Sequence, residues 1–188
     1  MPLTQEFHPT ETIVLVGMMG AGKTAIGRRI AKQLNLAFID ADDEIETAAG
    51  CAIEDIFKKH GETEFRDGER RVIKRLLQQP VHVLATGGGA FMDSETRAEI
   101  LKNSVSVWLR ADFDVLWRRV SRRSHRPMLK TADPRATLAE LIEKRYPTYK
   151  SADITVESRD APPGETVDRV IEALRNYYSS RKGTDERS

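Results

Sequence analysis

The amino-acid sequence predicts an α/β protein: a five-stranded parallel sheet with helices on both faces, arranged as three αβα layers. Two observations support this fold class. Short β-branched or apolar runs alternate with helical patterns along most of the chain, and the segments that connect them are short. Alternation of this kind builds a parallel sheet covered by helices on both sides. The length of 188 residues fits one domain.

The five expected strands are short runs rich in β-branched or other apolar residues. In chain order they cover Thr12–Val16, Ala37–Ile39, His82–Ala85, Val105–Leu109 and Ile154–Val156. A polar or glycine residue follows closely on each run, which indicates where the strand ends. These runs are expected to form the central sheet.

Helical patterns fill the gaps between the strands. The segments Lys23–Leu34, Glu64–Gln78 and Glu165–Tyr178 each place apolar residues on one stripe at helical spacing. Asp112 is expected to cap a further helix that runs through Val120.

One more helix has two possible starting positions, which lie about one turn apart. Asp133 followed by Pro134 fits an N-cap and the first helical position. Thr137 followed by Glu140 forms an alternative capping box. The sequence favours neither start over the other.

The two ends of the chain differ from its middle. Residues 1–10 are polar, contain two prolines and are expected to form a loose arm. Residues 11–178 are expected to form the single domain. Residues 179–188 have no apolar anchor and are expected to be disordered.

Composition excludes several classes of protein. The 30 Lys and Arg residues nearly balance the 29 Asp and Glu residues, so the formal charge is +1, too small for a general polyanion binder. A single cysteine, Cys51, excludes an intramolecular disulfide and argues against a cysteine-based zinc site. The N-terminus lacks a signal-peptide pattern, and no run of about 18 apolar residues occurs. We therefore expect a cytoplasmic protein that does not bind membranes.

The strongest signal is the glycine-rich segment Gly17-Met-Met-Gly-Ala-Gly-Lys-Thr24. It has the form G-x-x-x-x-G-K-[ST] between an expected strand and an expected helix, which is the context of a phosphate-binding loop, or P-loop. Its glycines let backbone N–H groups converge on phosphate oxygens, and the helix N-terminus adds a positive dipole end. Lys23 is expected to reach the β- and γ-phosphates, and the Thr24 hydroxyl is expected to bind Mg²⁺.

The expected ATP-binding residues of this segment are Gly20, Ala21, Gly22, Lys23, Thr24 and Ala25. The P-loop by itself fits a kinase, a GTPase, another ATPase or a protein with a structural nucleotide. No Asn-Lys-x-Asp segment, which would read guanine, is present in the chain, and this disfavours a GTPase.

Two further segments follow strands that should end beside the P-loop. Asp40 and Asp42 come at the end of the second strand, at the edge where parallel α/β sheets bind ligands. One could act toward Mg²⁺ and the other toward an acceptor hydroxyl, or both could merely cap the next helix. The third strand runs into Gly87, Gly88 and Gly89, which permit close approach of a backbone N–H to an anion or form a tight turn.

Six motifs in one order make the chain resemble the shikimate kinases. After the P-loop come Asp40-Ala-Asp42, Gly61-Glu-Thr-Glu-Phe-Arg66, Gly87-Gly-Gly89, Arg126-Pro-Met-Leu129 and Arg145-Tyr-Pro-Thr-Tyr149. Their order and spacing match over roughly residues 11–178. The resemblance implies a P-loop kinase fold with a mobile lid at about residues 122–133.

The resemblance also implies roles for individual residues. Asp42 would hold the hydroxyls of shikimate, and Asp40 would lie with Thr24 in the metal and water shell. Arg66 and Arg145 would bind the substrate carboxylate, which suits guanidinium groups because they bind carboxylates bidentately. Gly87, Gly88 and Gly89 would complete the substrate site. Without its neighbours, Arg66 would instead be interpreted as a solvated charge.

An arginine-rich segment runs into the expected lid: Arg118, Arg119, Arg122, Arg123 and Arg126. It could be a solvated helix face, which suits Arg118 and Arg122, or a nucleic-acid patch, which the missing aromatic platform and near-neutral charge disfavour. The resemblance implies instead that Arg126 contacts the transferring phosphoryl group. It also implies that Arg119 packs on the adenine, with Pro163 as the opposite wall.

The sequence therefore predicts ATP- and Mg²⁺-dependent phosphorylation of the 3-hydroxyl of shikimate, a step of aromatic amino acid biosynthesis. Lys23, Asp42 and Arg126 are the expected catalytic residues. The alternative is another small-metabolite or nucleotide kinase on the same scaffold. The expected partners are ATP and shikimate, with no nucleic acid and no membrane, and the family resemblance implies a monomer.

Overall fold

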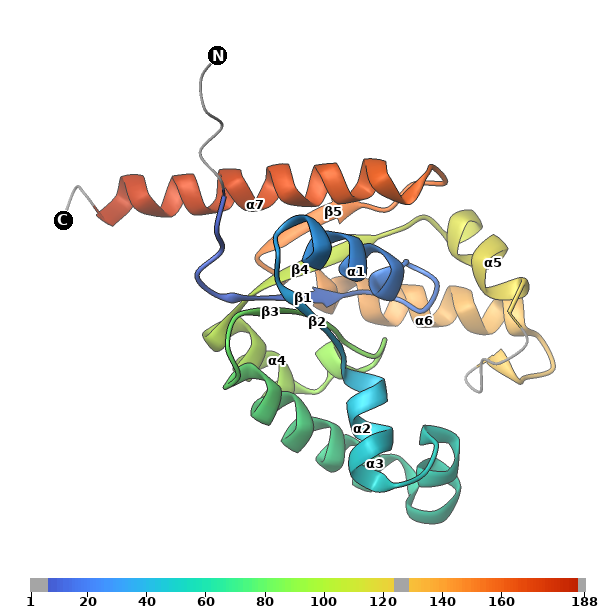
Figure 1. The fold of residues 1–188 in the computed structure, drawn as a ribbon. Coiled ribbons are helices and arrows are strands. Elements are labelled where there is room, and N and C mark those ends of the chain that lie inside the picture. The colour runs from blue at the N-terminus through green and yellow to red at the C-terminus, as the bar shows by residue number, and fades with distance from the viewer. Residues whose placement is uncertain (1–6, 124–128, 186–188) are drawn as a thin grey trace.

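The structure, a computed structural model, describes residues 7–123 and 129–185. Five parallel strands form one sheet in the order β2-β3-β1-β4-β5 (Figure 1). The expected five-stranded parallel sheet is confirmed. The order places β1, which carries the P-loop at its end, in the middle of the sheet and next to β3 and β4.

The strands lie where the sequence predicts them. Two have the expected bounds and the other three are longer by one residue at one or both ends. They are β1 Thr12–Val16, β2 Ala37–Asp40, β3 His82–Ala85, β4 Ser104–Arg110 and β5 Ile154–Glu157. Leu15 pairs with Ala85 and Val16 with Trp108, so the carboxyl ends of the three central strands meet at one edge.

Helices cover both faces of the sheet. α1 and α7 contact each other on one side, and α4 lies on the other (Figure 1). The helices are α1 Lys23–Gln33, α2 Ala41–Ala49, α3 Ile53–Leu77, α4 Ser94–Asn103, α5 Phe113–Ser121, α6 Pro134–Tyr149 and α7 Pro163–Asp185, with a 3₁₀ turn, η1, at Ala90–Met92. The three αβα layers are confirmed.

Local backbone chemistry explains where the helices depart from expectation. α3 begins at Ile53 rather than Glu64, because a helical segment before Gly61 joins the expected one across a kink at that glycine (φ 79°). α6 begins at Pro134, and the Asp133 carboxylate accepts a hydrogen bond from the Ala136 N–H, so the earlier of the two possible starts is correct. Asp112 occupies the N-cap of α5 without a side-chain capping bond.

The C-terminal segment differs from the expectation. Residues 179–185 continue α7, although this part of the chain was expected to be disordered. Contacts of Tyr178, the last residue of the expected helix, and of Arg181 tie α7 to the N-terminal segment. The rings of Phe7 and Tyr178 lie 5.5 Å apart, and Arg181 forms an ion pair with Glu11 at 2.9 Å.

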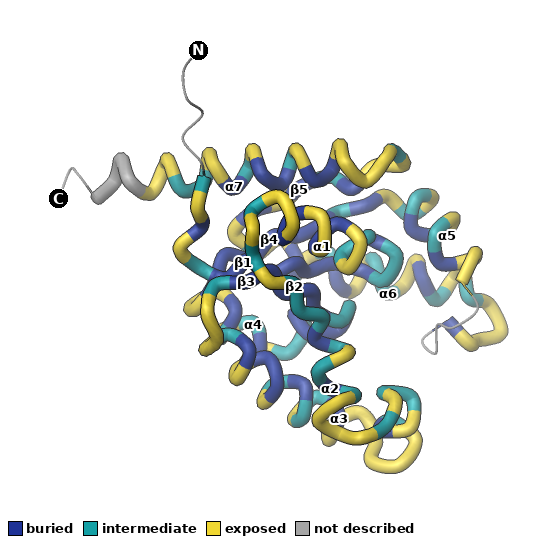
Figure 2. The backbone as a smooth tube through the Cα atoms, viewed as in Figure 1, coloured by how far each residue is buried: buried dark blue, intermediate teal, exposed yellow. Residues whose placement is uncertain are grey.

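The core lies between the sheet and its helices, and exposed residues lie along the outer faces of the helices (Figure 2). Every residue of β1 and β3 is buried. Such burial holds the strand ends rigidly, so the loops that follow them are presented from a fixed edge. Within the described residues, no helix combines the length and the apolar character needed to cross a bilayer.

Candidate active site

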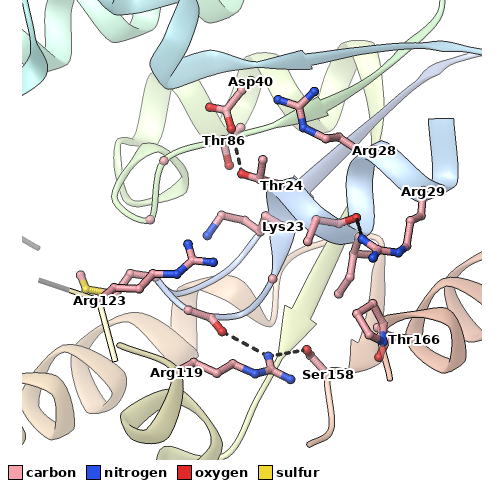
Figure 3. A pocket seen from close by; sticks show the side chains of 18 of the residues that line it. Lys23, Thr24, Arg28, Arg29, Asp40, Thr86, Arg119, Arg123, Ser158 and Thr166 are labelled. Carbon is pink, nitrogen blue, oxygen red and sulfur yellow. Dashed lines mark hydrogen bonds between the residues drawn. The ribbon is translucent and has the colours of Figure 1, made fainter. Parts of the chain in front are cut away.

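A cavity of about 850 Å³ opens at the carboxyl ends of the central strands (Figure 3). Five parts of the chain meet there: the P-loop with the start of α1, the end of β2, the glycine segment after β3, the arginines at the end of α5, and the segment between β5 and α7. This is the edge where open parallel sheets bind their ligands.

The P-loop forms the floor of the cavity. Gly20 and Gly22 adopt left-handed φ values of 81° and 93°, which glycine reaches without steric cost. α1 begins directly after Gly22, and no side chain caps it there. The N-terminus of a helix carries the positive end of its dipole, which favours an anion at this place. The Lys23 ammonium donates to the carbonyl oxygens of Gly17 (2.7 Å) and Met18 (2.9 Å) and projects into the cavity.

Asp40 is the helix cap that the sequence allowed, and it also contacts the P-loop. Its carboxylate caps α2 by accepting a hydrogen bond from the Asp42 N–H at 3.0 Å. Its other oxygen accepts a hydrogen bond from the Thr24 hydroxyl at 2.8 Å (Figure 3). The helix cap therefore holds Asp40 beside the P-loop hydroxyl, with a set of oxygen ligands suited to a hard cation.

Asp42 lies in a less polar environment than its neighbour Asp43. Burial, and to a smaller extent the nearby Asp40, raise its pKa to about 6, although the Lys23 ammonium acts in the opposite direction. A carboxyl group with a pKa near neutrality can exchange a proton in the physiological range. Asp42 is the described carboxylate best suited to accept a hydrogen bond, or a proton, from a hydroxyl in this cavity.

The three consecutive glycines make room for side chains of the site. A Cβ atom on Gly87 would lie 2.9 Å from an Asp42 oxygen, and one on Gly88 would lie 3.2 Å from an Arg145 guanidinium nitrogen. A Cβ on Gly89 would lie 2.2 Å from an Arg66 nitrogen, which is a steric clash. The glycine segment thus packs directly against the aspartate and the two arginines, which come from three different helices.

Arg66 is an ordered part of this cluster, and the interpretation as a solvated charge is wrong. Only 19% of its side chain is exposed, and it pairs with Glu69 at 2.7 Å. Arg145 is buried as well. Glu69 was not anticipated from the sequence; it is 1% exposed, and burial raises its pKa against the opposing effect of Arg66. Its spacing of three residues after Arg66 on a helix was the available signal.

Tyr149 was also missed as a separate contributor. Its hydroxyl donates a hydrogen bond to the Gly88 carbonyl, and its ring stacks on Trp108 at 5.7 Å between centroids. Burial raises its pKa, so it remains a neutral donor. Tyr149 therefore fixes the middle of the glycine segment.

The arginines in the last turn of α5 and just after it have separate environments. The Arg119 guanidinium donates to the Gly20 carbonyl (3.1 Å), to the Ser158 hydroxyl (3.1 Å) and to the Arg159 carbonyl (2.7 Å). Arg118 is exposed and paired with Asp160, as its expected place on a solvated face implies. Arg122, which was assigned to the same face, is exposed as well, and it also lines the cavity together with Arg123.

Two expectations remain, for Pro163 and for Arg126. Pro163 begins α7 and lines the cavity wall along which Arg119 also lies, where the adenine was expected. Arg126 falls outside the described residues, and so does the middle of the expected lid. No group of three or more His, Cys, Asp or Glu side chains in the described ranges is placed to hold a metal ion.

The sequence model of one family, described as shikimate kinase, matches residues 19–175. The chain belongs to the shikimate kinase family. It is 57% identical over 165 residues to the shikimate kinase of Rhodopseudomonas palustris, covering 88% of this chain and 81% of that protein. It is 58% identical over 166 residues to the shikimate kinase of Bradyrhizobium diazoefficiens, covering 88% and 80%.

Solved structures agree with this assignment. A shikimate kinase from Acinetobacter baumannii in complex with shikimate superposes with a TM-score of 0.86 at 34% identity, covering 90% of this chain and 96% of that one. A gluconokinase from Sinorhizobium meliloti reaches a TM-score of 0.63 at 20% identity, covering 97% and 99%, and shares the fold alone. The chain is thus a shikimate kinase family member with the P-loop kinase fold that the sequence predicted.

Proposed function

We propose that this member of the shikimate kinase family transfers the γ-phosphoryl group of ATP to the 3-hydroxyl of shikimate. The observation that carries the proposal is the meeting of two half-sites at one edge of the sheet. The P-loop supplies a cradle for phosphates, and the cluster around the glycine segment supplies two guanidinium groups and a carboxylate for a small hydroxylated acid. Each half-site needs the other for a transfer reaction.

The nucleotide occupies the P-loop end of the cavity. Backbone N–H groups from Gly22 to Ala25 and the Lys23 ammonium bind the phosphates, because these donors lie at the start of α1. Gly20 and Ala21 shape the loop, and the Ala21 N–H donates to the Met18 carbonyl within it. Arg119 and Pro163 border the adenine. Arg126, from the lid, stabilises charge on the transferring phosphoryl group.

Thr24 and Asp40 would hold Mg²⁺. Both are oxygen ligands, and their hydrogen bond of 2.8 Å already places them side by side at the phosphate end of the cavity. Mg²⁺ in kinases keeps several waters and takes its other ligands from the nucleotide, so two protein oxygens fit this ion without a dedicated cluster of carboxylates. When bound, the ion supplies positive charge beside the phosphates.

The acceptor occupies the glycine-segment end. Arg66 and Arg145 bind the substrate carboxylate, assisted by the backbone of Gly87, Gly88 and Gly89. This carboxylate anchors the ring, and Asp42 then accepts a hydrogen bond from the hydroxyl that attacks. Glu69 keeps Arg66 directed at the site.

Transfer needs positioning more than chemical activation. The transition state of phosphoryl transfer is loose, so the attacking hydroxyl requires correct placement and a late, weak base. Asp42 suits this role, because a pKa of about 6 lets it take the hydroxyl proton as the new O–P bond forms. Lys23 and Arg126 offset the charge that moves toward the departing ADP.

A coupled assay of ADP release tests this proposal with a panel of acceptors: shikimate, gluconate and several nucleoside monophosphates. We expect shikimate to give by far the highest kcat/KM. A higher value with gluconate or a nucleoside monophosphate would overturn the acceptor assignment and favour the alternative kinase. A monomeric state and a cytoplasmic location remain predictions, which chromatography and cell fractionation can check.

A further inference from the structure

Ser158 is a buried serine that neither the motifs nor the proposed mechanism uses. It follows β5 and is 2% exposed. Its hydroxyl donates a hydrogen bond to the Ala21 carbonyl oxygen at 2.8 Å. The same hydroxyl accepts a hydrogen bond from Arg119 at 3.1 Å (Figure 3). Its own N–H donates to the Arg110 carbonyl at 2.6 Å, which fixes the serine to the end of β4. A residue 137 positions away in sequence thus holds the P-loop backbone.

The contact acts on one peptide unit of the P-loop. The carbonyl of Ala21 and the N–H of Gly22 belong to the same planar peptide, and no peptide in the described structure is cis. In a trans peptide these two groups point in opposite directions. When the Ala21 carbonyl points at Ser158, the Gly22 N–H must point away from it. Among the described residues, this N–H has no backbone hydrogen-bond partner, and Gly22 lines the cavity.

The loop itself does not determine this orientation. Gly22 has a φ of 93°, and glycine populates positive and negative φ almost equally. The Ala21–Gly22 peptide can therefore rotate at low steric cost, which would turn the carbonyl oxygen toward the phosphates. The preceding peptide is held differently, because the Ala21 N–H donates to the Met18 carbonyl at 3.1 Å within the loop. Of the two backbone groups of Ala21, the carbonyl is the one that Ser158 holds.

We propose that the Ser158 hydroxyl is a positioning group for the P-loop, which holds the Ala21 carbonyl so that the Gly22 N–H faces the bound phosphates. This inference rests on the proposed nucleotide site. It assigns Ser158 to phosphate binding rather than to the adenine wall, although Arg119 contacts the same hydroxyl. In this protein, a side chain 137 residues after Ala21 would thus hold the P-loop in the conformation that binds phosphate.

Inorganic tripolyphosphate, which carries phosphates without adenine, separates these possibilities. For Ser158→Ala we expect the Kd for tripolyphosphate and the Kd for ATP to rise by a similar factor, about three- to tenfold, the worth of one hydrogen bond. The KM for shikimate and the Kd for adenosine should stay unchanged. Ser158→Thr, which keeps the hydroxyl, should restore phosphate binding. In a protein labelled with ¹⁵N-glycine, the Gly22 amide signal should shift on addition of tripolyphosphate in wild type and much less in Ser158→Ala.

Ser104→Ala is the matched control. Ser104 is also buried and donates to a backbone carbonyl, that of Ile100, at 2.6 Å, but it begins β4 at the opposite edge of the sheet. It should lose a comparable amount of thermal stability and keep the wild-type affinity for tripolyphosphate. Equal affinities of Ser158→Ala and wild type for tripolyphosphate, or a change confined to adenosine, would overturn the inference. Failure of the wild-type protein itself to bind tripolyphosphate would overturn the proposed nucleotide site.

Discussion

Replacing Asp42 with asparagine separates the role of this carboxylate in catalysis from its effect on stability. A pKa raised from 3.8 to about 6 means that the ionised form is disfavoured in the folded protein, by about 3 kcal/mol relative to water. Asp42 is partly exposed, and solvent screening reduces this figure, so we expect about 1–2 kcal/mol. The asparagine side chain carries no charge, so the folded variant does not carry this free-energy penalty.

The sign of the effect follows from the direction of the pKa shift. Above pH 6 the wild-type carboxylate is ionised in both the folded and the unfolded state, so the folded state carries the whole penalty. As the pH falls from about 6 to 3.8, the folded protein takes up a proton that the unfolded chain does not, and the penalty disappears. Asp42→Asn should therefore be more stable than wild type at pH 7.5, and the difference should shrink toward pH 4.

Thermal unfolding of both proteins between pH 4 and pH 8 measures this difference. At about 2–4 °C per kcal/mol for a chain of this size, Tm should rise by several degrees at pH 7.5. Turnover with shikimate should fall at least about a hundredfold in the same samples, as expected for loss of a base. Asp43→Asn is the control: this neighbour is exposed, so it should give a smaller rise in Tm and near wild-type turnover. A difference in Tm that is absent, or constant with pH, would refute burial as the cause.

Two further predictions concern charges at and beside the site. Arg145→Ala should raise the KM for shikimate at least tenfold, since a hydrogen bond to a charged group is worth about 1.5–3 kcal/mol, while the Kd for ATP measured without acceptor stays unchanged. The KM for a shikimate analogue with a neutral amide in place of the carboxylate should change little in this variant. An equal rise in KM for the amide and the acid would contradict the assignment. Asp93, whose pKa the hydrogen-bonded Arg70 lowers to about 2, should stabilise the fold above pH 4 and lose this effect as the pH falls toward 2. Asp93→Asn should accordingly lower stability by about 1 kcal/mol at pH 7 in denaturant titrations. The difference from wild type should shrink as the pH falls from 4 to 2, and a gap that stays constant over this range would rule out the ion pair.

The sequence by itself determined the parts of this protein that depend on contiguous residues. The P-loop is one such part, because its phosphate donors are consecutive backbone N–H groups whose geometry follows from the glycines and the helix after them. The five strands are another, since each is a short apolar run with a clear end. The order of the six motifs was sufficient to identify the family, because that order can be read from the sequence without the structure.

Tertiary structure decided what depends on distances through space. The strand order β2-β3-β1 brings the end of β2 and the glycine segment beside the P-loop, and only then does Gly89 lie against Arg66 and Gly88 against Arg145. The pKa of Asp42 depends on its burial, which no local pattern encodes. Ser158 has no motif at all, because its effect on the P-loop is one hydrogen bond across the fold. A linear sequence records which residues are neighbours along the chain, whereas desolvation and hydrogen bonding depend on which atoms meet after the chain has packed.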